Sequence, residues 1–125
     1  MLANRNAMAT IAVKDLAAAK KFYGGTLGLT PLETSEEGVL TYQSGTATVV
    51  VYVSSFAGTN QATSATWSVG DEFDGILQAL KARGVVFEHY DMPGMTLEGD
   101  AHVAGDYKGA WFKDLDGNIL HILNR

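Results

Sequence analysis

The chain has 125 residues, no cysteine and a net charge of −5, from 9 Lys and Arg against 14 Asp and Glu. These values exclude disulfides and thiolate metal sites, and they argue against nucleic acid or an anionic membrane as a partner. The first ten residues lack the pattern of a signal peptide, and no apolar run reaches the ~18 residues of a membrane span. We therefore expect a single-domain cytoplasmic protein.

A repeat at an offset of 56 residues divides the chain into two halves. Segment 9–15 reads ATIAVKD and segment 65–71 reads ATWSVGD, and each is followed by an amphipathic helix, a glycine and short strands. This pattern predicts an α+β fold built from two tandem βαβββ modules. The expected boundaries within the single domain 1–125 are 8–54 for the first module, 55–63 for a linker and 64–124 for the second module.

In the first module, Asp15 is expected to cap a helix, because its carboxylate can accept hydrogen bonds from the free N–H groups of the first turn. Apolar residues then recur at helical spacing as far as Leu27. Three strands follow, separated by turns that contain glycine. Their expected ranges are 31–36, 39–44 and 46–53.

In the second module, Asp71 is expected to cap a helix that ends at Gly84. The Asp116-Gly117 pair predicts a tight hairpin turn, because glycine adopts the positive φ that such a turn needs. The polar, glycine-rich segment 91–107 is too long for a plain turn, and we interpret it as a loop that covers a site. The expected strands are 85–89, 109–113 and 118–123.

Two motifs carry a resemblance to a known family. The opening VKDLAAAKKFYGGTLGL at 13–29 and the closing WFKDLDGNILHIL at 111–123 resemble those of the vicinal oxygen chelate superfamily, with Leu115 in place of the usual proline. This superfamily includes glyoxalase I, the bleomycin and fosfomycin resistance proteins and the extradiol dioxygenases. The resemblance implies a curved mixed sheet around a central cavity, and it implies a homodimer.

The resemblance also implies where a metal would bind. Enzymes of the superfamily place metal ligands on the first and last strands of each module, and the corresponding residues here are Met8, Tyr52, Ser64 and His121. Methionine sulfur is a soft ligand, and serine and tyrosine hydroxyls are poor ones. One histidine cannot hold a catalytic divalent cation by itself. We therefore expect no metal and no other cofactor.

The candidate site centres on His121, a lone imidazole on an apolar strand that can act as a hydrogen-bonding group or as an acid/base catalyst. Trp111 lies ten residues earlier, so a symmetric hairpin places it opposite His121 on the same face, where it can stack a flat ligand. Trp67 has the opposite parity and is expected under the helix. The other candidate ligand-binding residues are Tyr52, Met8 and Tyr42 as walls, Ser64 and Thr66 as polar anchors, and His102 in the proposed loop.

His102 has Glu98 and Asp100 close before it, which raises the alternative of an improvised metal site with His121, but a solvated loop with an incidental histidine is the favoured interpretation. The preferred function is metal-independent binding or sequestration of a partly aromatic small molecule, as the resemblance to bleomycin resistance proteins implies. The alternatives are a glyoxalase I-like lyase or dioxygenase with a non-standard metal site, or a cofactor-free catalyst that uses His121. A third is a partner-binding module with a collapsed cavity.

Overall fold

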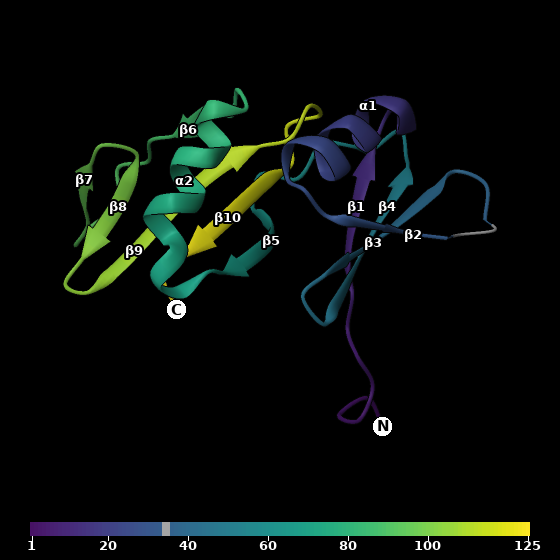
Figure 1. Ribbon diagram of the computed structural model, residues 1–125, viewed down its shortest axis with the longest axis horizontal. Coiled ribbons are helices and arrows are strands. Elements are labelled where there is room, and N and C mark those ends of the chain that lie inside the picture. Colours follow the sequence, from purple (N-terminus) through teal and green to yellow (C-terminus); the bar gives the residue numbers. More distant parts are fainter. Residues whose placement is uncertain (34–35) are drawn as a thin grey trace. The chain divides into compact units, whose positions relative to one another are not determined.

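A computed structural model describes residues 1–33 and 36–125 (Figure 1). The chain divides into two compact units, which are Met1–Asn60 with Leu115–Asn118, and Gln61–Asp114 with Ile119–Arg125. The boundary at residues 60 and 61 falls within the segment 55–63 that was expected to link the modules. Within the described residues, no helix is both long and apolar enough to cross a membrane.

The first unit contains one four-stranded sheet in the order β1-β4-β3-β2. Strands β1 and β4 run parallel, and the remaining neighbours are antiparallel. Two of the residues predicted for the first of the three strands, 34 and 35, lie outside the described part of the chain. The elements are β1 (Ala9–Val13), α1 (Leu16–Lys20), its continuation as a π-helix η1 (Lys21–Thr26), β2 (Thr30–Leu32), β3 (Val39–Ser44) and β4 (Ala47–Val53).

Local interactions explain how this unit is held together. The Asp15 carboxylate accepts a hydrogen bond from the Ala18 N–H at 3.0 Å, which confirms the predicted helix cap. The hairpin turn Leu115–Asn118 also belongs to this unit. It is anchored there because the buried Asn118 amide donates to the Ala12 carbonyl oxygen at 2.7 Å.

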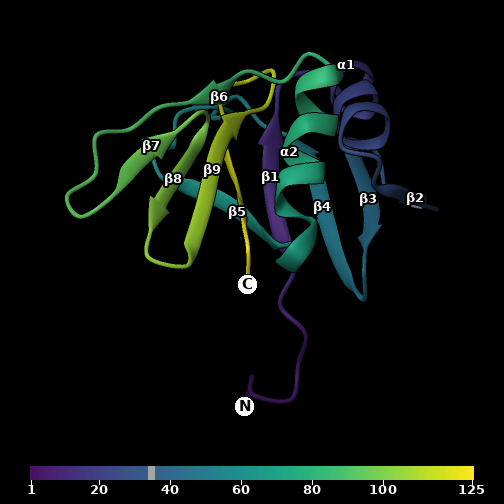
Figure 2. The ribbon, with the colours of Figure 1, turned by 60° about the vertical axis from the view of Figure 1, so that its left-hand side comes forward.

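The second unit contains a six-stranded sheet in the order β5-β10-β9-β8-β7, with β6 paired to β9 (Figures 1 and 2). The first and last strands of this unit, β5 and β10, run parallel like β1 and β4, so the two modules share this core arrangement, and the second adds the hairpin of β7 and β8. The elements are β5 (Thr63–Ser68), a 3-10 turn η2 (Gly70–Glu72), α2 (Phe73–Ala82), β6 (Phe87–Glu88), β7 (Thr96–Glu98), β8 (Ala101–Ala104), β9 (Tyr107–Lys113) and β10 (Ile119–Leu123).

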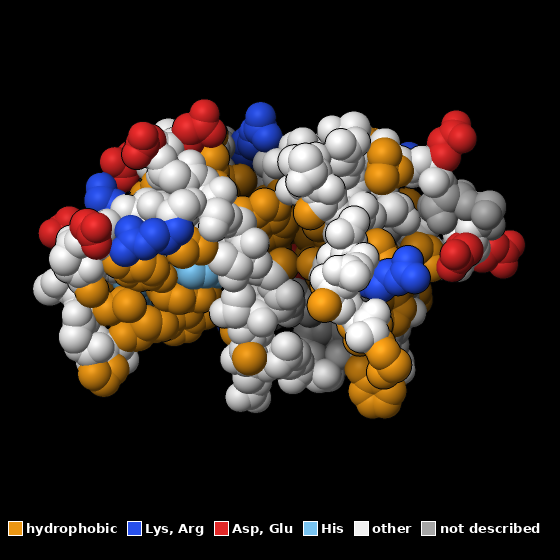
Figure 3. Space-filling model, turned by 90° about the horizontal axis from the view of Figure 1, so that it is seen from below, with side chains coloured by type: hydrophobic (Ala, Val, Ile, Leu, Met, Phe, Trp, Pro, Cys, Tyr) orange, Lys and Arg blue, Asp and Glu red, His pale blue; other side chains and the backbone are white. Residues whose placement is uncertain are grey.

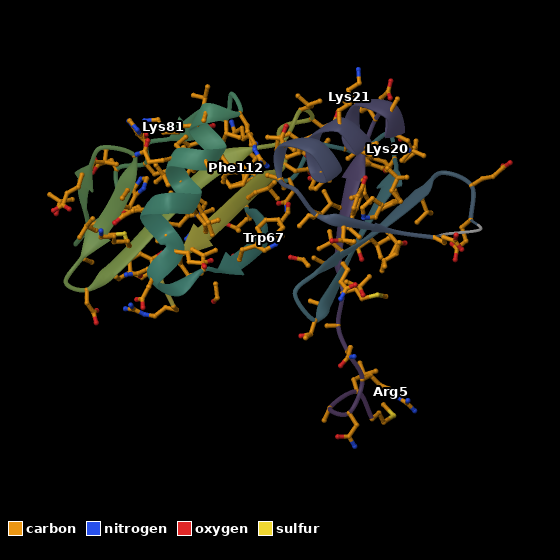
Figure 4. All side chains as sticks on the ribbon, viewed as in Figure 1. Arg5, Lys20, Lys21, Trp67, Lys81 and Phe112 are labelled. Carbon is orange, nitrogen blue, oxygen red and sulfur yellow. The ribbon has the colours of Figure 1, made fainter. Side chains whose placement is uncertain are left out.

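Helix α2 covers one face of this second sheet (Figure 1). Its buried residues Phe73, Leu77 and Leu80 form the apolar stripe that the helical spacing predicted. The sheet contributes Phe112, which lies beside α2 in Figure 4, and the neighbouring Leu120 to the same core. Because strand side chains alternate, the residues between these point to the other face, which we call the open face.

The structure corrects two predictions about this unit. Asp71 does not cap α2, because the chain first makes the turn η2, and no side chain caps the helix that follows. Segment 91–107 is not a loop that covers a site, because it contains the β7–β8 hairpin and the start of β9. Gly99 and Gly105 adopt the positive φ that the two tight turns of this segment require.

Candidate functional site: an aromatic cluster on the open face of the second sheet

The site is built around the pair Trp111 and His121. These residues lie directly opposite each other on β9 and β10. Their rings stack with centroids 4.2 Å apart and planes only 16° from parallel. The Trp111 indole N–H donates to the Thr63 hydroxyl at 3.2 Å, which fixes the ring in this orientation. The spacing of ten residues therefore predicted that the two residues lie opposite each other on one face, and the stacking of their rings is an addition from the structure.

Both ring nitrogens of His121 have hydrogen-bond partners. Nδ1 lies 3.3 Å from the Thr66 hydroxyl on β5, and Nε2 lies 3.2 Å from the Tyr107 hydroxyl on β9. The side chain is only 8% exposed, and this burial, together with the charge of His102 when protonated, lowers the pKa of His121 to about 4. His121 is therefore a neutral hydrogen-bonding group at neutral pH.

Two further rings complete the cluster. His102 on β8 is 1% exposed and meets Trp111 edge-on, with centroids 4.9 Å apart and an interplanar angle of 89°. Tyr90, which follows β6, meets Trp111 at 5.9 Å and 70°. The Tyr90 backbone N–H donates to His102 Nε2 at 2.9 Å, which ties the end of β6 to β8. The aromatic cluster is thus Tyr90, His102, Tyr107, Trp111 and His121.

Gly109 makes room for the hydrogen bond inside this cluster. It lies between Tyr107 and Trp111 on β9 and pairs with His102 on β8. A Cβ atom at this position would collide with the Tyr107 hydroxyl and come within 2.9 Å of His121 Nε2. The absence of a side chain at Gly109 is therefore what allows Tyr107 to reach across the sheet to His121.

The sequence-predicted residues fall into two groups. The second unit brings together Trp111, His121, Thr66 and His102, while Ser64 lies two residues before Thr66 on β5 and makes no side-chain hydrogen bond that adds to the cluster. Trp67 pairs with Ile122 rather than with His121, so it has the predicted opposite parity (Figure 4). The first unit carries Met8, Tyr42 and Tyr52.

The three residues of the first unit occupy different environments. Tyr42 is 1% exposed and packs against Tyr23 with ring centroids 6.4 Å apart, so it belongs to the core rather than to a wall. Tyr52 is partly exposed near the end of β4. Met8 is exposed and lines a hollow of about 560 Å³ together with Arg5, Asn6, Ala7, Thr46, Ala47 and Thr48.

The strand register also corrects the match between Tyr52 and His121. His121 lies opposite Thr66, and the repeat offset of 56 equates Thr66 with Thr10. Thr10 lies opposite Val50, two residues before Tyr52. Val50 is therefore the counterpart of His121 in the first module, and it offers no metal-ligating atom.

The improvised metal site is contradicted by the structure. Asp100 forms ion pairs with Lys81 on α2 (Figure 4) at 2.7 Å and with His89 at 2.8 Å, and both partners lower the pKa of this carboxyl group. His102 is not in a solvated loop but is buried beside Trp111. Across residues 1–33 and 36–125, no three His, Asp or Glu side chains gather in a way that would hold a metal ion.

Sequence reasoning missed Tyr90 and Tyr107. A signal for Tyr107 was present, because Tyr107, Gly109 and Trp111 follow a period of two that extends β9 beyond its predicted start. Tyr90 had no such signal, because it lies past the end of β6 and reaches the cluster through the tertiary fold.

The surface in Figure 3 shows hydrophobic side chains beside a small surface patch of histidine.

A sequence model of the Glyoxalase/Bleomycin resistance protein/Dioxygenase superfamily matches residues 5–122. The chain belongs to this superfamily. The match covers both modules and agrees with the shared topology of β1 with β4 and β5 with β10. No curated protein matches the chain.

Solved structures of the superfamily have the same fold. A glyoxalase/bleomycin resistance protein/dioxygenase from Alicyclobacillus acidocaldarius is 20% identical with a TM-score of 0.71, covering 96% of this chain and 90% of that one. The fosfomycin resistance protein FosX from Listeria monocytogenes is 15% identical with a TM-score of 0.68, covering 100% and 93%. Lactoylglutathione lyase from Agrobacterium tumefaciens is 15% identical with a TM-score of 0.69, covering 96% and 92%. These similarities support the fold of this chain, and its activity has to be inferred from the residues of the candidate site.

Proposed function

We propose that this superfamily member binds an uncharged, planar organic molecule at the aromatic cluster, without a metal ion. The observation that carries the proposal is the stack of Trp111 on a neutral His121 on the open face of the second sheet. Trp111 and Tyr107 are each only half-buried, so they present apolar surface with a few polar groups beside it. Mostly apolar sites with few placed polar groups are typical of small-molecule binding.

The charges near the cluster favour an uncharged ligand. Lys113 on β9 is paired with Glu88 at 3.0 Å, and Arg125, which lies over the Tyr107 ring at 5.6 Å, is paired with Asp106 at 3.2 Å. Each of these cations is therefore already neutralised by a carboxylate. A charged ligand would have to break such a pair or be desolvated without a partner, and both cost free energy.

The state of His121 favours binding over acid/base catalysis. A general base works best when its pKa lies near the working pH, whereas the pKa of His121 is about 4. Both of its nitrogens are also occupied, by Thr66 and Tyr107. His121 is therefore arranged to hold a neutral hydrogen-bond network rather than to exchange a proton.

The donor chemistry at the ligand positions of the superfamily does not fit a divalent metal. Those positions hold Met8, Ser64 and His121, and the fourth corresponds to Val50 by register. A single imidazole with a thioether and a hydroxyl does not replace the hydration shell of a hard or borderline cation. We therefore propose that ligand binding at this site involves no divalent metal.

The oligomeric state rests on the superfamily alone. We propose a homodimer, because members of the superfamily often associate in pairs, and we propose separately that it is located in the cytoplasm. Light scattering coupled to size-exclusion chromatography would give about twice the chain mass of 13.3 kDa if this is right. A mass equal to one chain at micromolar concentration would refute the dimer without affecting the proposed ligand site.

The function is tested by purifying the protein without chelators and measuring bound metal and ligand binding in parallel. Elemental analysis should find less than one divalent ion per ten chains. Thermal unfolding in the presence of small planar aromatics should show stabilisation that survives EDTA, of about 2.7 kcal/mol at a ligand concentration of 100 times Kd. A stoichiometric metal that is lost in His121→Ala would overturn the proposal in favour of a metal-dependent enzyme.

A further inference from the structure

Two buried polar atoms of the aromatic cluster have no hydrogen-bond partner. Within the described part of the chain, they are the Tyr90 hydroxyl and His102 Nδ1. Buried polar side-chain atoms are usually hydrogen-bonded, so each exception calls for an explanation. Here the two exceptions occur in neighbouring rings, whose centroids are 6.0 Å apart.

Both atoms are hydrogen-bond donors. His102 Nε2 accepts the backbone N–H of Tyr90, so the proton of the neutral imidazole must be on Nδ1. Burial and the carboxylate of Glu88 raise the pKa of the Tyr90 phenol, so its hydroxyl keeps its proton at neutral pH. The cluster therefore contains two donors, the Tyr90 O–H and the His102 Nδ1–H, and neither has an acceptor among the described residues.

The rings that carry these donors both contact Trp111, and this indicates which ligand they could bind. His102 and Tyr90 both meet Trp111 at a steep angle, with centroids 4.9 Å and 5.9 Å away. Both donors therefore belong to rings that contact Trp111, the ring we propose as the ligand platform. The Tyr107 hydroxyl in the same cluster is different, because it already forms a hydrogen bond with His121 and is not free to bind a ligand.

We propose that the Tyr90 hydroxyl and His102 Nδ1–H bind a carbonyl oxygen on the edge of a planar aromatic ligand. This inference rests on the proposed function and adds to it the chemical class of the ligand, an uncharged aromatic ketone, lactone or amide. A carbonyl oxygen has two lone pairs and accepts from both donors at once. The local cations are already paired with Glu88 and Asp106, so a neutral acceptor fits better than a carboxylate.

Access to the two donors involves segment 89–95, which joins β6 to β7 and carries Tyr90. This segment forms neither helix nor strand, and it contains a turn in which the Met95 N–H donates to the Met92 carbonyl oxygen at 3.1 Å. Both donor atoms are buried. A ligand therefore reaches the Tyr90 hydroxyl only when this side chain or its segment moves, and the carbonyl compensates for that movement by satisfying both donors.

The experiment compares 1-indanone with indane, its flat hydrocarbon counterpart, by titration of the full-length protein followed by NMR. The wild type should bind 1-indanone about tenfold more tightly than indane, which corresponds to one satisfied donor pair. Tyr90→Phe should lower this ratio to about threefold, because only the His102 donor then remains, and it should not lower stability, because the hydroxyl it removes has no partner. Tyr52→Phe, which removes a partly exposed tyrosine hydroxyl in the first unit, is the matched control, and the ratio should persist in it.

The histidine gives a second readout that does not depend on a variant. The ¹⁵N shifts should show His102 protonated on Nδ1 and unprotonated on Nε2, and 1-indanone should move the Nδ1 resonance while indane does not. Equal affinity of the wild type for the two compounds, or an unchanged ratio in Tyr90→Phe, would overturn the carbonyl proposal and leave the proposed function standing. Failure of both compounds to bind would refute the proposed function, and the carbonyl proposal with it.

Discussion

The buried imidazole of His121 makes the stability of this protein depend on pH in a way that can be calculated. An unfolded histidine titrates near 6.5, whereas burial lowers the pKa of His121 in the folded protein to about 4. Between these two values the unfolded chain binds a proton that the folded chain does not. The stability that the neutral His121 imidazole contributes is therefore fully present above pH 6.5, and this contribution is lost as the pH falls toward 4.

The size of the effect follows from the difference between the two pKa values, which is about 2.5. At about 1.36 kcal/mol for each pH unit, the full loss is roughly 3 kcal/mol, and most of it, roughly 2–3 kcal/mol, should be lost by pH 4.5. This is a large fraction of the stability of a small domain, which is typically about 5–15 kcal/mol. The transition midpoint in urea should therefore shift clearly between pH 7 and pH 4.5.

Urea unfolding followed by circular dichroism at a series of pH values measures this loss directly. His121→Gln removes the titrating group, so its stability should change with pH by roughly 2–3 kcal/mol less than that of the wild type over this range. His89→Gln is the matched control, because His89 is exposed and bonds to Asp100 outside the cluster. If the wild type and His121→Gln lose the same stability between pH 7 and pH 4.5, the neutral buried imidazole is refuted.

Five substitutions to alanine, two of them controls, test the packing around the site and the anchored turn, each by urea unfolding. Gly109→Ala should cost about 1–3 kcal/mol, because its Cβ collides with the Tyr107 hydroxyl, whereas Gly75→Ala in the first turn of α2, where a Cβ meets no other atom, should stabilise by up to about 1 kcal/mol. Equal effects at the two glycines would contradict the packing described. Asn118→Ala should cost about 1–3 kcal/mol, because it leaves a buried carbonyl oxygen without its donor, and a neutral result would show that the turn Leu115–Asn118 is not anchored there. Gly58→Ala should cost more than Gly45→Ala, since both have positive φ but only the first would press its Cβ into a backbone carbonyl.

Much of the fold could be predicted from the sequence because its signals are local. The repeat at an offset of 56 predicted two modules of one topology, and the Asp116-Gly117 turn fixed the register that places Trp111 opposite His121. In a hairpin the turn sets every cross-strand pair, so one well-placed glycine determines the pair. The apolar stripe of α2 could be predicted for the same reason, from spacing alone.

The rest of the site could not be predicted because it depends on contacts between distant segments. Strand β8 has four residues between two glycine turns, and such a short run has no periodicity to separate it from a loop. His102 therefore looked solvated, although pairing with β9 buries it. Tyr52 was misaligned by two residues because the turns of the modules differ in length, and only the register with β1 shows that Val50 is the counterpart of His121.

The most direct test of metal-independent binding at the aromatic cluster uses the fluorescence of Trp111. The chain has two tryptophans, so Trp67→Phe leaves Trp111 as the single reporter at the site, and Trp111→Phe leaves Trp67 on the opposite face as its control. In buffer with EDTA, titration with 1-indanone should change the emission of Trp67→Phe saturably and leave that of Trp111→Phe unchanged. An identical response in the two variants, or a response of Trp67→Phe that appears only when a divalent metal is added, would contradict the account.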